Sequence, residues 1–161
     1  MRFLLIVIGI IIGIYSGWQK HNERQKYPVG ICQNEFTPEQ VSEWARQAAE
    51  KAVVLQKDVP FEATSDRSLF TKQGWRSIND ALQAAGIADM ADSFSLQVTE
   101  SPSSQLSASG SWQTSLPVEM IYVREGSRNV RSAVMHMRLS CEKRADASVV
   151  LQIGQIIIGD K

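Results

Sequence analysis

The side chains that could carry chemistry in this chain are few, and its two histidines come first among them. His21 lies in a polar stretch near the amino terminus, and His136 lies in a stretch where apolar and polar residues alternate. An acid–base pair would need a carboxylate beside a histidine, and Asp66 or Asp80 could supply one for His136. The spacing favours a surface or hydrogen-bonded histidine over such a pair. We therefore predict no catalytic residue.

Metal and cofactor sites are not predicted either. The histidines are not accompanied by an HxxxH or CxxC pattern, or by carboxylates at ligand spacing. The sequence holds no glycine-rich phosphate loop, and the isolated Gly154 and Gly159 suit a strand bulge and a strand end. Met120, Met135 and Met137 recur at strand spacing, which is typical of a core. We expect no metal, no cofactor and no enzymatic activity.

An apolar run near the amino terminus predicts a membrane anchor. Residues 3–18 are sixteen consecutive uncharged, mostly apolar residues, and they follow Met1 and Arg2 directly. As a helix they would cover roughly 24 Å of a hydrocarbon core about 30 Å thick. A secretory signal peptide is the alternative, but Ser16-Gly17-Trp18 makes a poor cleavage site. We predict a transmembrane signal anchor over residues 1–18, a juxtamembrane linker over 19–35 and one folded domain over 36–161.

The balance of charge narrows the classes of partner. The chain has 17 basic and 17 acidic residues, of which four and two precede Phe36, leaving 13 basic against 15 acidic in the domain. Nucleic-acid binding needs clustered Lys and Arg, so no direct nucleic-acid partner is expected. Around the anchor, the positive charges on its two sides differ by one, which does not decide its orientation.

The two cysteines, Cys32 and Cys141, leave two interpretations open. An even number of cysteines in an exported chain would allow one disulfide. Two unrelated thiols, one of them packed in the core, are the alternative.

Two helices are predicted at the start of the domain. Thr37 as N-cap, Pro38 at the first helical position and Gln40 three residues after the cap form a capping box, and the apolar residues that follow recur on one face to about residue 56. Thr71 caps a second helix with an apolar face that ends near Gly86.

The second half of the domain changes to the two-residue period of strands. Alternating or β-branched segments cover residues 94–98, 112–122, 133–141 and 149–158, and residues 101–110 form a polar loop. Pro117 inside the second segment predicts an edge strand or a bulge. Helices followed by an antiparallel four-stranded sheet describe an α+β domain. Its predicted structural core comprises Trp44, Phe70, Trp75, Leu82, Trp112 and Val118.

The domain resembles the DotI/IcmL/TraM family of type IVB secretion and conjugal transfer proteins over residues 36–158. The resemblance lies in the following motifs: the Trp44-Ala45 helix, the Phe70-Thr71-x-x-Gly74-Trp75 helix start, and the strand with Trp112 and Leu116-Pro117-Val118. Members of that family resemble the VirB-type inner-membrane assembly factor, with one transmembrane helix and a cystatin-like α+β roll in the periplasm.

The resemblance implies a structural role and a location. We expect a single-pass protein of the bacterial inner membrane with its carboxyl-terminal domain in the periplasm, which forms a homo-oligomer and binds other secretion-system subunits. The alternative is a secreted or anchored cystatin-like roll that binds a small ligand or acts as an enzyme.

Overall fold

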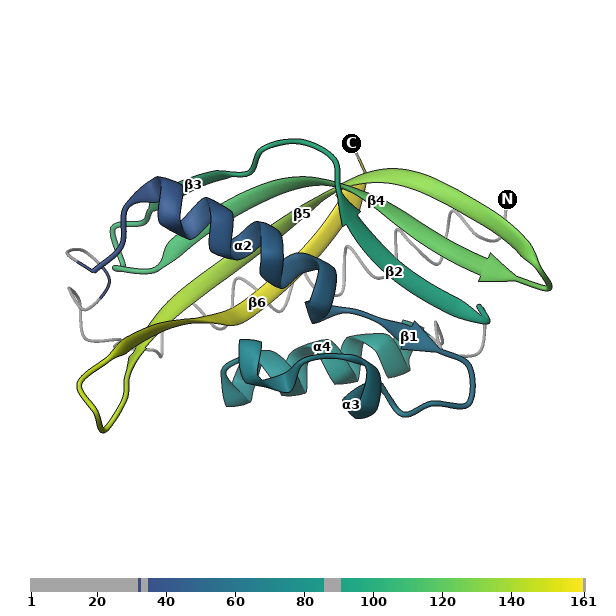
Figure 1. The fold of residues 1–161 in the computed structure, drawn as a ribbon, viewed down its shortest axis with the longest axis horizontal. Coiled ribbons are helices and arrows are strands. Elements are labelled where there is room, and N and C mark those ends of the chain that lie inside the picture. The colour runs from purple at the N-terminus through teal and green to yellow at the C-terminus, as the bar shows by residue number, and fades with distance from the viewer. Residues whose placement is uncertain (1–31, 33–34, 86–90, 161) are drawn as a thin grey trace.

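The structure, a computed structural model, describes residues 32, 35–85 and 91–160. Its helical part precedes its strands, and the strands form one curled antiparallel sheet (Figure 1). The helical part and the first short strand comprise α2 (Pro38–Ala52), β1 (Leu55–Gln56), α3 (Phe61–Thr64), a 3₁₀ turn η1 (Arg67–Leu69) and α4 (Lys72–Ala85). The remaining strands are β2 (Ser93–Val98), β3 (Ser103–Leu106), β4 (Trp112–Arg124), β5 (Ser127–Lys143) and β6 (Val149–Asp160).

The described sheet has six strands, not the four predicted. Its order is β1-β2-β4-β5-β6, and β3 pairs with the first half of β4. The two extra strands were missed because β1 is only two residues long and β3 lies in the predicted polar loop, where Ser and Gln replace an apolar alternation. The helices lie on the sheet as predicted: α2 packs against β2, β3 and β4, and α4 packs against β6.

Both predicted helix starts are confirmed. The Thr37 hydroxyl accepts a hydrogen bond from the Gln40 backbone N–H at 3.3 Å, and the Gln40 side chain accepts one from the Thr37 N–H at 2.9 Å. The Thr71 hydroxyl likewise accepts from the Gly74 N–H at 2.9 Å. These bonds satisfy backbone donors that have no partner within the helix. The predicted end of the second helix at Gly86 lies outside the described residues.

The first helix ends earlier than predicted. It stops at Ala52 rather than near Gln56, because Leu55 pairs with Phe94 and Gln56 with Ser93 to form the edge of the sheet. Apolar spacing continues through this segment whether it is helical or extended, so the pattern could not place the boundary.

Pro117 does not mark an edge strand or a bulge in β4. Strand β4 is central and pairs with β5 without a shift in register. On the other side of β4, the pairing with β2 ends at Val118 and the pairing with β3 begins at Ser115. Pro117 therefore falls in the gap between these two partner strands. A proline has no N–H to donate, and none is required on the side of β4 where neither β2 nor β3 pairs with it. The free Pro117 carbonyl instead accepts from the Thr99 N–H at 3.0 Å.

The core lies between the helices and the inner face of the sheet. Five of the six predicted core residues are buried there, and Trp44 is half-buried and packs against the cluster from α2. The buried five are Phe70, Trp75, Leu82, Trp112 and Val118. Strand β6 keeps its apolar residues on this face through a bulge, because the register of β5 and β6 shifts at Gly154, as predicted.

Helix α4 approaches β6 so closely that only glycine fits at the contact. The Ile153 carbonyl accepts a hydrogen bond from the Thr71 N–H at 3.0 Å, and the same oxygen lies against the Cα of Gly74. A Cβ on Gly74 would fall well inside the van der Waals separation from that backbone oxygen.

Gly74→Ala is therefore expected to destabilise the fold. The helix would gain up to about 1 kcal/mol in propensity, but displacing α4 from β6 should cost about 1–3 kcal/mol more than that gain. Urea denaturation followed by circular dichroism measures the change. Gly159→Ala is the matched control, since a Cβ there meets no atom within 4 Å. Equal stability of the two variants would show that α4 tolerates a wider separation.

Within the described ranges, no helix is long and apolar enough to cross a membrane. The predicted anchor, residues 1–18, lies outside those ranges, as does the predicted linker apart from Cys32 and Glu35.

Candidate functional site

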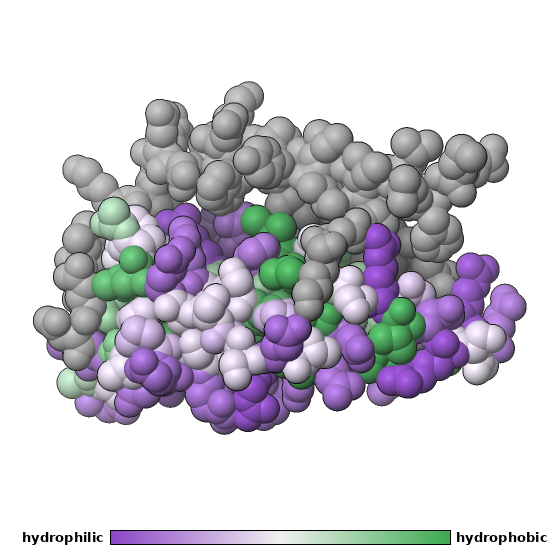
Figure 2. All heavy atoms as spheres, turned by 90° about the horizontal axis from the view of Figure 1, so that it is seen from above, coloured by the Kyte–Doolittle hydropathy of each residue, from purple (hydrophilic) through white to green (hydrophobic). Residues whose placement is uncertain are grey.

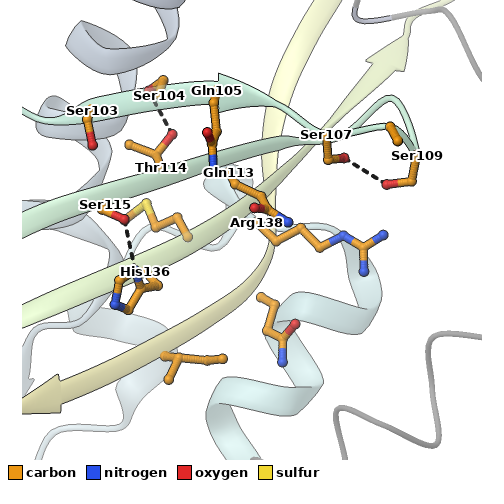
Figure 3. Close-up of a pocket in the computed structure, with 14 residues that line it drawn as sticks. Ser103, Ser104, Gln105, Ser107, Ser109, Gln113, Thr114, Ser115, His136 and Arg138 are labelled. Atoms are coloured by element: carbon orange, nitrogen blue, oxygen red, sulfur yellow. Dashed lines mark hydrogen bonds between the residues drawn. The ribbon is translucent and has the colours of Figure 1, made fainter.

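The outer face of the sheet carries two rows of mostly polar side chains that cross four strands. Pairing places Ser103, Ser115, His136 and Ile157 in one row, and Gln105, Gln113, Arg138 and Gln155 in the next. Because side chains alternate between faces along a strand, both rows point away from the core residues Met135 and Leu139. Together with the β3–β4 turn, they line an open groove of about 890 Å³ (Figure 3).

A serine and a histidine meet within the groove. The Ser115 Oγ and the His136 Nδ1 lie 2.9 Å apart, and the imidazole is exposed. A serine nucleophile would need the histidine to be oriented by a third group such as a carboxylate. The described residues that line the groove include no aspartate and no glutamate. The contact is therefore that of a hydrogen-bonded surface histidine.

Neither of the two carboxylates considered from the sequence reaches His136. Asp66 caps η1, where its Oδ1 accepts from the Ser68 N–H at 2.9 Å and from the Ser68 hydroxyl at 2.7 Å. Asp80 lies on α4, and neither aspartate lines the groove. His21 lies outside the described residues. Within the described part of the chain, no three His, Cys, Asp or Glu side chains cluster in a way that could hold a metal ion.

A cluster of hydroxyls lies at one end of the groove. The hydroxyls of Ser107, Ser109 and Ser111 lie 2.8 to 3.1 Å from one another around the β3–β4 turn. The Arg138 Nε donates to the Ser111 hydroxyl at 3.3 Å, which draws the guanidinium toward this turn (Figure 3). The groove can thus offer hydroxyl, amide, imidazole and guanidinium groups to a polar ligand or partner.

Sequence reasoning missed this groove because it depends on β3. The polar positions of β4 and β5 alternate with apolar ones, which indicates a solvated face but not which strands lie beside each other. Only the pairing of Ser103 with Ser115 and of Gln105 with Gln113 completes the rows.

The two cysteines come together in the structure. Cys32 and Cys141 form a disulfide that joins the chain just before α2 to the end of β5. Cys32 is buried with 3% of its surface exposed, although it precedes the predicted start of the domain at residue 36.

Comparison with known proteins finds the same fold in two solved structures of type IV secretion proteins. No family model and no curated protein matches the sequence. An IcmL-like type IV secretion system protein from Legionella pneumophila superposes with a TM-score of 0.65 at 12% identity, covering 78% of this chain and 94% of that one. The periplasmic domain of DotI gives 0.64 at 20% identity, covering 80% and 99%. The predicted resemblance to DotI and IcmL is confirmed at the level of the fold.

Proposed function

We propose that this chain, whose domain has the fold of the DotI periplasmic domain and of an IcmL-like protein, is a structural subunit of a type IVB secretion or conjugal transfer complex. The observation that carries the proposal is the extent of the match, which takes in 94% and 99% of the two neighbouring chains. Two of the motifs that suggested this family from the sequence lie at the start of α4 and on β4.

In this proposal, residues 1–18 anchor the chain in the bacterial inner membrane, and its cystatin-like domain lies in the periplasm. It acts by forming homo-oligomers and by binding other subunits, not by catalysis. The groove supports this assignment, because its described lining offers hydrogen-bonding groups without the carboxylate that would make Ser115 and His136 a catalytic set. The competing proposal is that the roll binds a small ligand or acts as an enzyme, and it rests on the same groove. The two experiments that follow distinguish these two functions.

Replacing His136 with alanine should leave function nearly intact if the role is assembly. The side chain is exposed and its one described hydrogen bond is to Ser115, so the fold should lose less than about 1 kcal/mol. The measurement is complementation of a deletion strain, scored as conjugal transfer or effector secretion. Ser115→Ala is the matched control, because it breaks the same hydrogen bond from the other side. Loss of transfer in a folded His136→Ala protein would favour the ligand-binding or enzymatic function.

The second arm of this experiment removes the predicted anchor. Deleting residues 3–18 and exporting the domain behind a cleavable signal should give a folded protein that fails to complement. Anchoring confines subunits to two dimensions and raises their effective concentration by about two orders of magnitude or more. A soluble domain that complemented fully would overturn the proposed role as a membrane-anchored subunit.

A further inference from the structure

The outer face of the β4–β5 hairpin carries an apolar pair. Strands β4 and β5 pair Ile121 with Val130, and the alternation of side chains places both on the face opposite to the core residues Val118 and Ala133. The hairpin projects sideways beyond α2 (Figure 1). Val130 has 45% of its surface exposed, the larger value of the two exposed large apolar residues in the described chain, and Ile121 is half-buried beside it.

Two opposite charges flank this pair on the same face. Glu119 lies two residues before Ile121 on β4, and Arg128 lies two residues before Val130 on β5. Because the strands are antiparallel, Glu119 lies toward the middle of the sheet and Arg128 toward the hairpin turn. Strand geometry puts their Cα atoms roughly 14 Å apart. Within the described chain the two side chains form no ion pair with each other.

This pattern is complementary to itself. A two-fold axis that lies in the plane of the face, between Ile121 and Val130, turns a second copy over and exchanges the two sides of the apolar pair. Sheets packed face to face cross at about 30°, which moves a residue two positions from the axis sideways by most of one strand spacing. Arg128 of each copy then lies over Glu119 of the other, and Val130 lies over Ile121.

We propose that two copies of this chain meet through the hairpin face, by which we mean Glu119, Ile121, Arg128 and Val130. This inference rests on the assembly role proposed above and names the surface through which that assembly forms. The apolar pair lies at the centre of the contact, and two Glu119–Arg128 ion pairs join the copies at its sides. The ion pairs fix the orientation of the copies more than they add affinity, because they lie near solvent.

The placement of the charges favours a second copy as the occupant of this face. A contact between identical chains across a two-fold axis needs each charge on one side of the centre to be matched by its opposite on the other side. Glu119 and Arg128 satisfy this condition, since both lie two residues from the apolar pair and in opposite directions. A contact with a different protein would place no such condition on this face.

The size of the contact fits an anchored protein. The described surface visible in Figure 2 is mostly polar, and on the side where the hairpin lies a small apolar patch is bordered by polar side chains. A contact built on one apolar pair and two ion pairs is small, and small contacts are weak in dilute solution. Confinement of both copies to one membrane raises their effective concentration.

Energy transfer between labelled copies measures the association. The full chain carries a donor or an acceptor dye on a cysteine added after Lys161 and is reconstituted into phosphatidylcholine vesicles. Cys32 and Cys141 are joined to each other, so the dye reacts with the added thiol. We expect energy transfer to rise with the number of chains per lipid beyond the level of randomly placed chains.

An exchange of the two charges tests the orientation of the copies. Glu119→Arg and Arg128→Glu should each weaken association by about tenfold, because each brings like charges together on both sides of the contact. The variant with both changes restores two opposite pairs and should associate within about threefold of the unchanged chain. Glu142→Arg is the matched control, because Glu142 lies exposed on the same side of β5 but outside the hairpin face. It should associate like the unchanged chain.

A charge at the centre of the contact gives a second measurement. Val130→Asp puts a carboxylate against Ile121 of the other copy and should weaken association by about tenfold or more. Val59→Asp is the matched control, because Val59 is the other exposed large apolar residue of the described chain and lies between β1 and α3. It should leave association unchanged. Urea denaturation of each variant checks that the monomer folds as before.

The proposal is supported by weaker association of both single charge variants, recovery in the double variant and loss with Val130→Asp. Folded single variants that associate like the unchanged chain, a folded double variant that stays dissociated, or an unchanged chain that does not associate would each overturn it. Failure of the secretion role is a separate result. A chain that associates through this face but does not complement a deletion strain would refute that role and leave the contact standing.

Discussion

Replacing Trp75 with alanine should lower the free energy of unfolding by about 3–5 kcal/mol, the range for removing a large aromatic residue from a core. Trp75 is buried, with 6% of its surface exposed. Its indole ring stacks on the Phe61 ring with 4.9 Å between the centroids, and it contacts the Phe70 ring edge-on with 5.3 Å between the centroids. The Arg67 guanidinium carbon lies 6.0 Å from the centroid of the indole. One side chain thus joins α3, η1 and α4.

The measurement is the midpoint and slope of a urea denaturation curve, together with complementation in the deletion strain. A loss of this size is a large part of the 5–15 kcal/mol that stabilises an ordinary domain, so we expect transfer or secretion to be abolished through unfolding. Trp44→Ala is the matched control, because Trp44 is half-buried on α2. Its replacement should lower the free energy of unfolding clearly less. A Trp75→Ala protein as stable as the Trp44→Ala protein would show that the aromatic cluster does not hold α4 in place.

Loss of the disulfide should have an effect of similar size. Cys32 and Cys141 are 109 residues apart in the sequence, and closing a loop of that length is worth roughly 4–5 kcal/mol in the chain-entropy model. The double variant Cys32→Ser, Cys141→Ser should unfold at a lower urea concentration by the corresponding amount. The chain before α2 would also lose its attachment to the end of β5.

Reduction supplies the control for this prediction. A reducing agent should destabilise the unchanged chain and leave the double serine variant unaffected, since only the former has a bond to break. Thiol labelling of denatured, unreduced protein from the periplasm gives an independent measurement. Full labelling of both cysteines would contradict the prediction, because a disulfide blocks the reagent.

The local features of the fold could be predicted because they depend on neighbours in the sequence. The Thr37 capping box and the Thr71 cap are confirmed, since a cap needs only the residues three positions away. The four long strands and most of the core were predicted from periodicity, which reports which face of an element is buried. A bulge was predicted at Gly154, because an isolated glycine inside a β-branched segment often marks a bulge.

The features that depend on strand partners could not be predicted. Strand β3 is polar and short, and it becomes a strand because β4 supplies its hydrogen bonds. Pro117 violates the expectation for a central strand, and only the gap between β2 and β3 explains why it is tolerated. Trp44 satisfies the apolar pattern of α2 but lies at the rim of the core, where packing leaves it half exposed.

The sequence by itself determined the class of fold, its helix starts and the resemblance to secretion proteins, because these follow from short-range spacing and from residue type. Only the tertiary structure decided that Ser115 meets His136 and that Pro117 falls between the partner strands β2 and β3. Both facts depend on strand register, which long-range pairing determines through hydrogen bonds between backbones that are alike at every position.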